Sequence, residues 1–298
     1  MESKEQQALQ KLSEVDFELL LLEDTLKGED GDTITSVRGK LEEVRQILAK
    51  PEERRTTHHN ILVIGDIHGS GVWKRVMEHY ITSHGDPDLI IFIGDYFDSE
   101  DIGVHKEFKN FEEILELRRK NPQQVVLLVG NHDFHYMPWA VARAIQYTGF
   151  RRSKIYRATP ELNKALQRGH LQACYIHKNM IFTHAGISQV WLDNHNLTIS
   201  QDEINKAFVE TPHIFHFLDD PKKERIPRPS GSNVWQSPMW IRPKALKTVL
   251  PEGYTQIVGH SHHEDIREYA AGALIVCDAL PYEYISIKDG NVIKHKLP

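Results

Sequence analysis

Three short apolar runs, each followed at once by glycine and then by oxygen or nitrogen donors, constrain this chain more than any other feature. They are residues 61–64 before Gly65-Asp66-Ile67-His68, residues 89–93 before Gly94-Asp95, and residues 125–129 before Gly130-Asn131. Short runs that are apolar at every position are typical of strands buried on both faces of a parallel sheet. Because sites form at the carboxyl ends of such strands, the three loops are expected to meet at one place.

Helical periodicity separates these runs and places the chain in the α/β class. Residues 71–83 and 106–120 have a helical pattern, so this part reads strand, helix, strand, helix, strand. Further strands are predicted at residues 175–176, 180–182, 256–258 and 273–276, and a hairpin at 284–287 and 292–295 around Asp289-Gly290. Residues 219–243 are rich in proline and predict a long irregular segment.

The amino-terminal residues 1–57 predict a separate unit. Apolar residues from Ala8 to Leu26 and from Ile34 to Leu48 alternate at spacings of three and four, which is the pattern of a coiled-coil seam. An antiparallel helical hairpin with a linker is therefore expected over 1–57, followed by the main domain over 58–298. The hairpin is interpreted as a packing arm or as the element through which a homo-oligomer forms, with a dedicated partner-recognition module as the alternative.

Charge and cysteine content narrow the partners. The formal net charge is −6, and residues 1–57 hold 14 Asp and Glu against 9 Lys and Arg, so the main domain is nearly neutral. No basic footprint is present, which disfavours nucleic acid as a partner without excluding it. Cys174 and Cys277 lie in apolar stretches and are expected to be buried thiols. With no membrane-length apolar run and no signal-like start, a soluble cytoplasmic protein without membrane contact is expected.

Two more blocks add imidazoles after predicted strands, and together the blocks indicate a metal site. They are Thr183-His184-Ala185-Gly186 and Gly259-His260-Ser261-His262. Carboxylates and imidazoles gathered in one place without a metal would repel one another or stay unpaired, whereas bound cations reverse that cost. Carboxylate, amide and imidazole donors suit Mn²⁺, the first expectation, and also Fe or Zn²⁺, and neither cysteine falls in a block.

The ordered blocks GDIHG, GDYFD, GNHD, THAG and GHSH resemble the calcineurin-like metallophosphoesterase superfamily, closest to its phage-type and eukaryotic protein serine/threonine phosphatase branch. The resemblance implies an αββα sandwich of two mixed β-sheets, with the amino-terminal hairpin outside it. It also implies two divalent metal ions. Their ligands would be Asp66 and His68 for the first ion, Asp95 bridging both, and Asn131, His184 and His260 for the second. His262 matches a further histidine of the wider superfamily and would complete the first ion's ligands.

The resemblance further implies a reaction and its acid. A hydroxide bridging the metals would attack the phosphorus, and His132 would protonate the leaving oxygen. Asp98 would orient His132. The alternative is that this carboxylate only caps the helix that follows it. The hydrogen bond between Asp98 and His132 is expected to raise the pKa of His132 and keep the ring able to donate a proton.

One departure from the family pattern concerns phosphate binding. The protein phosphatases continue the second block with an arginine that holds the substrate phosphate, where this chain has Ser99 and Glu100. Arg242, in Trp240-Ile241-Arg242, resembles a second family arginine and is the expected phosphate contact. Another cation is expected to contact the phosphate in place of this arginine, and a basic group after the third block offers candidates. The alternative is that these side chains only face solvent. The members of this group are Arg143, Arg151, Arg152, Lys154 and Arg157.

The function expected is hydrolysis of phosphomonoesters by a metal-dependent phosphatase, with a phosphoprotein or a small phosphorylated molecule as substrate. A phosphodiesterase, nuclease or nucleotide pyrophosphohydrolase on the same fold is the alternative. A non-catalytic scaffold is the second alternative, disfavoured because the expected ligands and acid are all present.

Overall fold

The predicted buried strands lie side by side in one mixed sheet. The computed structural model describes residues 58–147, 149–218 and 231–298. Within them, β1 (Asn60–Ile64), β2 (Leu89–Phe92) and β3 (Val125–Leu128) pair in parallel, and β4 (Leu171–Gln172) extends this edge. β10 (Glu283–Lys288) and β11 (Asn291–Lys296) form the other edge by antiparallel pairing, so the order is β11-β10-β1-β2-β3-β4. The positive φ angles of Asp289 and Gly290 make the tight turn predicted between β10 and β11.

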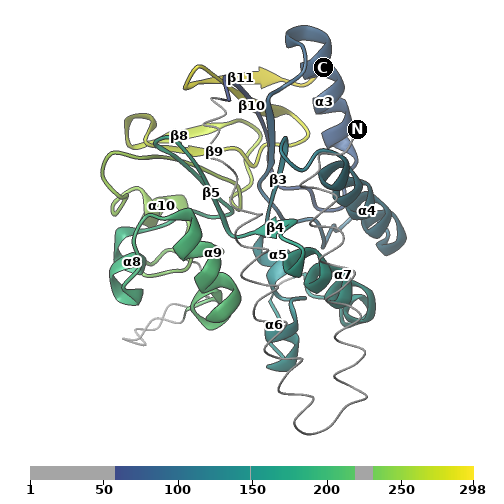
Figure 1. Cartoon of the computed structure of the whole chain (residues 1–298), viewed down its shortest axis with the longest axis vertical. Coiled ribbons are helices and arrows are strands. Elements are labelled where there is room, and N and C mark those ends of the chain that lie inside the picture. The colour runs from purple at the N-terminus through teal and green to yellow at the C-terminus, as the bar shows by residue number, and fades with distance from the viewer. Residues whose placement is uncertain (1–57, 148, 219–230) are drawn as a thin grey trace, which may run out of the picture. The chain divides into compact units, whose positions relative to one another are not determined.

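A second mixed sheet faces the first (Figure 1). Its order is β5 (Cys174–His177), β6 (Met180–Thr183), β7 (Thr255–Val258), β9 (Leu274–Val276) and β8 (Arg267–Tyr269). β6, β7 and β9 run parallel, while β5 and β8 pair antiparallel at the two edges. Within each sheet, the parallel strands therefore end at the same edge.

Helices fill the connections and cover the sheets (Figure 1). In chain order they are α3 (Val72–His84), α4 (Val104–Lys120), α5 (Asn131–Phe134), α6 (Pro138–Ala142), α7 (Ile155–Gln167), α8 (Gln189–His195), α9 (Gln201–Glu210) and α10 (Pro243–Leu246). Short 3₁₀ turns occur at η1 (Arg152–Lys154), η2 (Pro212–Phe215) and η3 (Ala270–Gly272). No helix of the described residues is long and apolar enough to cross a membrane.

Side chains of β1 point alternately to the two faces of its sheet and show what packs on each face. Ile61 and Val63 pack into an apolar cluster with Phe182 and Ile257 of the second sheet, so this face lies between the sheets. Leu62 and Ile64 point the other way, into the cluster that also holds Trp73 of α3 and Phe108 of α4. A third cluster, formed by Val258 and Val276 with Leu246 of α10, covers the outer face of the second sheet. The layers are helix, sheet, sheet, helix, which confirms the predicted sandwich.

Cys174 and Cys277 are buried free thiols, as expected. The predicted amino-terminal hairpin and its role in oligomer formation lie outside the described residues, as do residues 219–230 of the proline-rich segment. The described part of that segment, from Gly231 onward, leads into α10.

Candidate metal centre and its acid

The predicted ligands lie where strands of both sheets end. Asp66, Asp95 and Asn131 follow β1, β2 and β3, while His184 and His260 follow β6 and β7. The sheets meet at this edge, because the His260 backbone N–H donates to Asp66 Oδ2 at 3.0 Å. His184 Nδ1 lies 3.2 Å from the Ile93 carbonyl oxygen at the end of β2. The sandwich thus assembles the site from segments far apart in the sequence.

Donor atoms of these side chains converge. Asp66, Asp95 and His184 place ligand atoms within 4.8 Å of one another, and all three residues are buried. Asn131 Oδ1 lies 2.8 Å from His184 Nε2 and 2.7 Å from His260 Nδ1. His184 Nε2 is also 3.4 Å from Asp95 Oδ2. Two imidazoles, an amide oxygen and two carboxylates therefore surround a common position.

His68 approaches the same position from the loop after β1. Its Nε2 lies 3.6 Å from Asp95 Oδ2, and its Nδ1 lies 3.0 Å from the Phe97 carbonyl oxygen. When Nδ1–H donates to that carbonyl, Nε2 keeps the lone pair that a metal ligand needs.

The backbone at this site has no room for a side chain at two glycines, and it is strained at two residues that are not glycine. A Cβ at Gly130 would lie 2.1 Å from Asp95 Oδ1, and a Cβ at Gly259 would lie 1.9 Å from Asp66 Oδ1. The non-glycine residues Asp95 and His260 adopt left-handed conformations, with φ of 52° and 63°. Such conformations cost free energy and persist where the surroundings enforce them, often at functional sites.

The electrostatics of these groups fit bound cations. Burial raises the pKa of Asp66 well above its usual range, and neighbouring Asp278 raises it further. Burial also raises the pKa of Asp95, with Asp133 adding to the effect. Burial lowers the pKa of His184 and of His260 and favours the neutral ring that binds metal. A cation among them would offset the cost of two buried carboxylates, so the donor set suits divalent metals.

His262 and Asp278 form a pair beside this cluster. His262 Nδ1 lies 3.3 Å from Asp278 Oδ1, and the His262 side chain is 60 % exposed. The hydrogen bond with Asp278 raises the pKa of His262. His262 therefore faces Asp278, and its service as a metal ligand stays a prediction. Asp278 itself was not predicted, although it follows the apolar strand β9 as the other carboxylates follow theirs.

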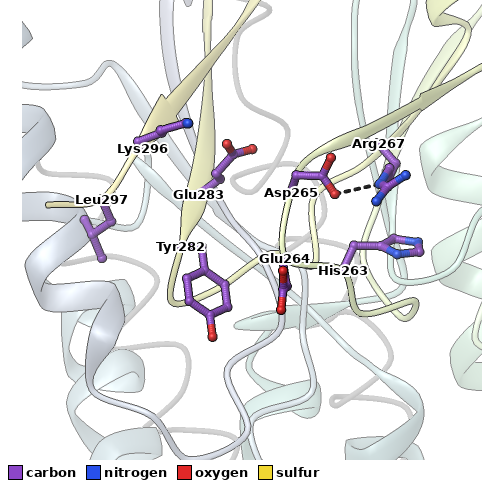
Figure 2. Close-up of a pocket in the computed structure, with 8 residues that line it drawn as sticks. All are labelled: His263, Glu264, Asp265, Arg267, Tyr282, Glu283, Lys296 and Leu297. Atoms are coloured by element: carbon purple, nitrogen blue, oxygen red, sulfur yellow. Dashed lines mark hydrogen bonds and ion pairs between the residues drawn. The ribbon is translucent and has the colours of Figure 1, made fainter.

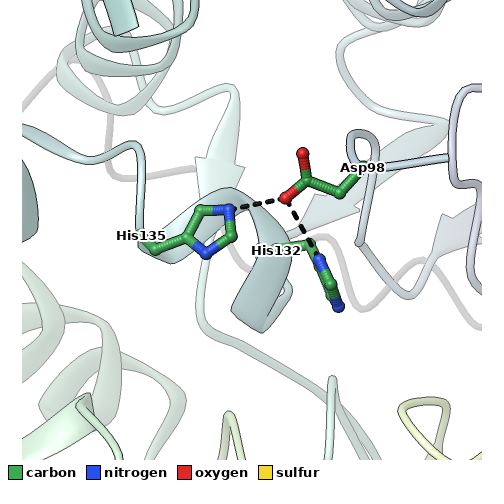
Figure 3. A group of neighbouring side chains, drawn as sticks. All are labelled: Asp98, His132 and His135. Atoms are coloured by element: carbon green, nitrogen blue, oxygen red, sulfur yellow. Dashed lines mark hydrogen bonds and ion pairs between the residues drawn. The ribbon is translucent and has the colours of Figure 1, made fainter. Parts of the chain in front are cut away.

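The predicted acid lies on α5, in the turn after β3. His132 Nδ1 is 3.1 Å from Asp98 Oδ2, and Figure 3 shows the other ring nitrogen pointing away from Asp98. The same carboxylate oxygen lies 2.6 Å from His135 Nε2, and Asp98 Oδ1 accepts from the Tyr136 hydroxyl and the Lys154 ammonium, each at 2.7 Å. Asp98 is thus a buried centre for four donors.

The hydrogen bond with Asp98 raises the pKa of His132, as predicted, but the net shift of this pKa is downward. Burial lowers the pKa of His132, and this outweighs the opposing hydrogen bond with Asp98. Burial of Asp98 would raise its own pKa, but hydrogen bonds from His132, His135 and Lys154 hold it below the usual range. Asp98 is therefore an ionised acceptor for the His132 ring.

At Ser99, where the family pattern has an arginine, the side chain bonds to the backbone of its own loop. Ser99 Oγ accepts from the backbone N–H groups of Asp101 and Ile102, at 3.3 and 3.0 Å, so it closes a local turn. Of the basic group, Arg151 donates to the Ser99 carbonyl at 2.6 Å and Lys154 reaches Asp98. Arg143 lies over the Trp139 ring and Arg157 pairs with Glu112 and Glu161.

Arg242 lies next to the predicted ligand His260. Its Nη1 donates to the His260 carbonyl at 2.6 Å and to the Ser261 hydroxyl at 3.2 Å. Burial lowers its pKa, while Asp66 acts in the opposite direction, yet a guanidinium keeps its charge at neutral pH. A cation is thereby held at the edge of the carboxylate cluster.

A cavity of about 760 Å³ is lined by the segment after β7 and by residues at the ends of β10 and β11 (Figure 2). Its lining residues are His263, Glu264, Asp265, Arg267, Tyr282, Glu283, Lys296 and Leu297. Arg267 pairs with Asp265 at 2.6 Å, so acidic and basic groups offset each other there. None of the predicted site residues lines this cavity, and it is distinct from the metal centre.

Comparison with known proteins agrees with the fold and the motifs. The family model for calcineurin-like phosphoesterases matches residues 59–264. A cold-active protein-tyrosine phosphatase of a psychrophilic Shewanella species has a similar structure, with a TM-score of 0.53, 15% identity and 81% of each chain covered. A protein serine/threonine phosphatase from Saccharomyces cerevisiae gives a TM-score of 0.51 at 14% identity, covering 82% of this chain and 81% of its own. The search of curated proteins finds no match. On its family match, this chain belongs to the calcineurin-like phosphoesterases.

Proposed function

We propose that this protein is a dinuclear metal-dependent phosphatase that hydrolyses phosphomonoesters of proteins or of small molecules. The observation that carries the proposal is a buried carboxylate, amide and imidazole cluster lying beside a histidine held by Asp98. Family membership supports hydrolysis of phosphoric esters.

The cluster would hold two divalent cations, with Mn²⁺ expected first and Fe or Zn²⁺ as alternatives. The proposed ligands are Asp66, His68, Asp95, Asn131, His184 and His260, with His262 as a further candidate. Such ions supply an acidified water and positive charge for the phosphoryl oxygens. The convergence of Asn131 Oδ1 with two imidazole nitrogens supports this assignment.

Other side chains would bind the substrate and move a proton. Arg242 extends its guanidinium beside His260 and is the proposed phosphate contact. His132, whose Nδ1 faces Asp98, would donate a proton from its outer nitrogen to the leaving oxygen.

A phosphodiesterase or nucleotide pyrophosphohydrolase is the competing function, and Ser99 is the observation that favours it. A phosphomonoester carries about two negative charges near neutral pH, since its second pKa is about 6, whereas a diester carries one. A site with Ser99 in place of an arginine has one cation fewer to offer, which suits the less charged substrate.

Hydrolysis of para-nitrophenyl phosphate and of its bis ester, compared in Mn²⁺, tests the proposal. A higher kcat/KM for the monoester supports the phosphatase, and a higher value for the diester supports the competing function. Protein that binds the metal yet hydrolyses neither ester would count against both and favour a scaffold. A chelated sample is the control for metal dependence.

A further inference from the structure

Lys154 is a buried cation beside the proposed acid. It lies in η1, just before α7, and its side chain is fully buried. Its ammonium is 2.7 Å from Asp98 Oδ1 and 2.7 Å from Glu107 Oε2, and both carboxylates are also fully buried. A lysine is rarely buried this completely unless it is paired.

Packing alone does not account for this residue. Burying an ion pair costs desolvation that the attraction between the charges repays only in part, and apolar residues of similar size commonly replace such pairs without loss. The ammonium lies at a place where its partner Asp98 also contacts His132. A role in setting the state of Asp98 therefore explains the charge better than stability does.

The geometry shows what the ammonium adds. An ionised carboxylate offers about four lone-pair positions, and Asp98 accepts four contacts, from His132, His135, Tyr136 and Lys154. These donors fix both carboxylate oxygens. A neutral Asp98 would carry a hydrogen and lose acceptor capacity, so the cation keeps an acceptor facing His132 Nδ1.

Glu107 extends the group to the loop that lacks the family arginine. Its Oε1 accepts from the Ser99 backbone N–H at 2.7 Å, while its Oε2 binds Lys154. Glu107 belongs to α4, so the ammonium joins α4, η1 and the loop after β2. Asp98, His132 and His135 could also hold a metal by their spacing, but the Lys154 ammonium already supplies the positive charge beside Asp98.

We infer that Lys154 is a positioning residue that keeps Asp98 ionised and aimed at His132, so that the outer nitrogen of His132 can protonate the leaving oxygen. The inference rests on the proposed function, because Lys154 acts only through His132. Its effect should therefore depend on how much protonation the leaving group needs.

The test compares Lys154→Met with the unaltered protein in Mn²⁺ on para-nitrophenyl phosphate and on an alkyl phosphate. With the alkyl ester, a poor leaving group, kcat should fall by part of the about 10²- to 10⁴-fold that a general acid contributes. With para-nitrophenyl phosphate the loss should be much smaller. In a His132→Asn background, Lys154→Met should cause little further loss, because residues that act as a unit are not additive.

Two further variants separate positioning from folding. Leu162→Ala removes a fully buried side chain from α7 and should lower the Tm without changing the ratio of rates on the two esters. If Lys154→Met fails to fold, Lys154→Met with Glu107→Gln carries the test, since it removes one charge of each sign and keeps the net charge of the group.

Equal losses on the two esters, no loss, or additivity with His132→Asn would overturn the role of Lys154. These outcomes leave the proposed function standing, because the unaltered protein still hydrolyses esters. If the unaltered, metal-loaded protein hydrolyses no ester, the proposed function itself fails, and the role of Lys154 fails with it.

Discussion

Asp95 and Asp98 lie three residues apart in one loop, and their surroundings are opposite. Asp95 is buried near other carboxylates, and burial, followed by the charge of Asp133, raises its pKa. Asp98 is also buried, yet it contacts an ammonium and two imidazoles, and its pKa lies below the usual range. The contrast separates two kinds of site. The carboxylates around Asp95 form the proposed metal site, whereas Asp98 is already paired with the Lys154 ammonium of this chain.

The largest effect is expected at Asp95, where a substitution tests most directly whether the two aspartates serve different sites. Asp95→Asn removes the charge proposed to bridge two cations, so metal content should fall at both positions. The kcat/KM should fall by more than the about 10⁴-fold upper limit for loss of a general acid. Metal analysis after gel filtration and para-nitrophenyl phosphate kinetics measure both effects. Wild-type metal content and rate in this variant would refute the assignment.

The matched change at Asp98 should leave the metals in place. Asp98→Asn keeps the size of the side chain but removes the charge that Lys154 and two histidines face. Metal content should stay at the wild-type level, in contrast to Asp95→Asn. A parallel loss of metal in the two variants would mean that the loop forms one site and not two.

His132→Asn comes next and sharpens the role of the Asp98 side. Turnover of an ester with a poor leaving group should slow by about 10²- to 10⁴-fold, with metal binding intact. The loss should be smaller with para-nitrophenyl phosphate, because para-nitrophenolate leaves with little protonation. Steady-state kinetics on both esters measure the ratio, and equal losses would argue against a general acid.

A smaller effect is expected at Asp278, the residue that links the metal side to His262. Asp278 is 5% exposed, lies near Asp66 and faces His262 at 3.3 Å. Asp278→Asn should weaken metal affinity by about 10- to 100-fold, as the loss of a residue that hydrogen-bonds a metal ligand commonly does. Calorimetric titration with Mn²⁺ measures this, and His262→Ala is the companion variant. A loss in His262→Ala as large as in Asp95→Asn would identify His262 as a direct ligand.

The convergence of Asp66, Asp95 and Asn131 was predictable from the sequence because each of them follows a strand within three residues. The apolar run fixes where β1, β2 and β3 end, and the next residues are then placed by the sheet itself. Asp278 has the same relation to β9, but it lacks the preceding glycine that drew attention to Asp66 and Asp95. A search for any acid after a buried strand would have found it.

The surroundings of Asp98 could be predicted only in part from the sequence. The Asp98–His132 contact follows from the family motif, whereas Lys154 lies 56 residues from Asp98 and carries no local signal of burial. The helix α7 that follows Lys154 contains Pro160, which obscures its helical pattern. Short edge strands such as β8 were missed as well, because pairing with β9 forms them and not an apolar pattern of their own.

The smallest effect on catalysis is expected outside both sides, in residues 1–57. The family match begins at residue 59, and the residues proposed for the site all come later in the chain. The sequence predicts a helical hairpin for these residues, and a lone hairpin would bury too little apolar surface to persist without tertiary contacts. It is therefore expected to dock on its own main domain or to pair with a second copy.

Deleting residues 1–57 should change solubility, oligomer size or Tm, while para-nitrophenyl phosphate turnover stays within a few fold. Sedimentation distinguishes the two forms of docking, because only pairing with a second copy predicts that the full chain is larger than a monomer and the truncated chain is not. Metal analysis and circular dichroism show whether the truncated protein is intact. A folded, metal-loaded truncated protein without activity would place the hairpin in the active site, and the division of the chain at residue 57 would be wrong.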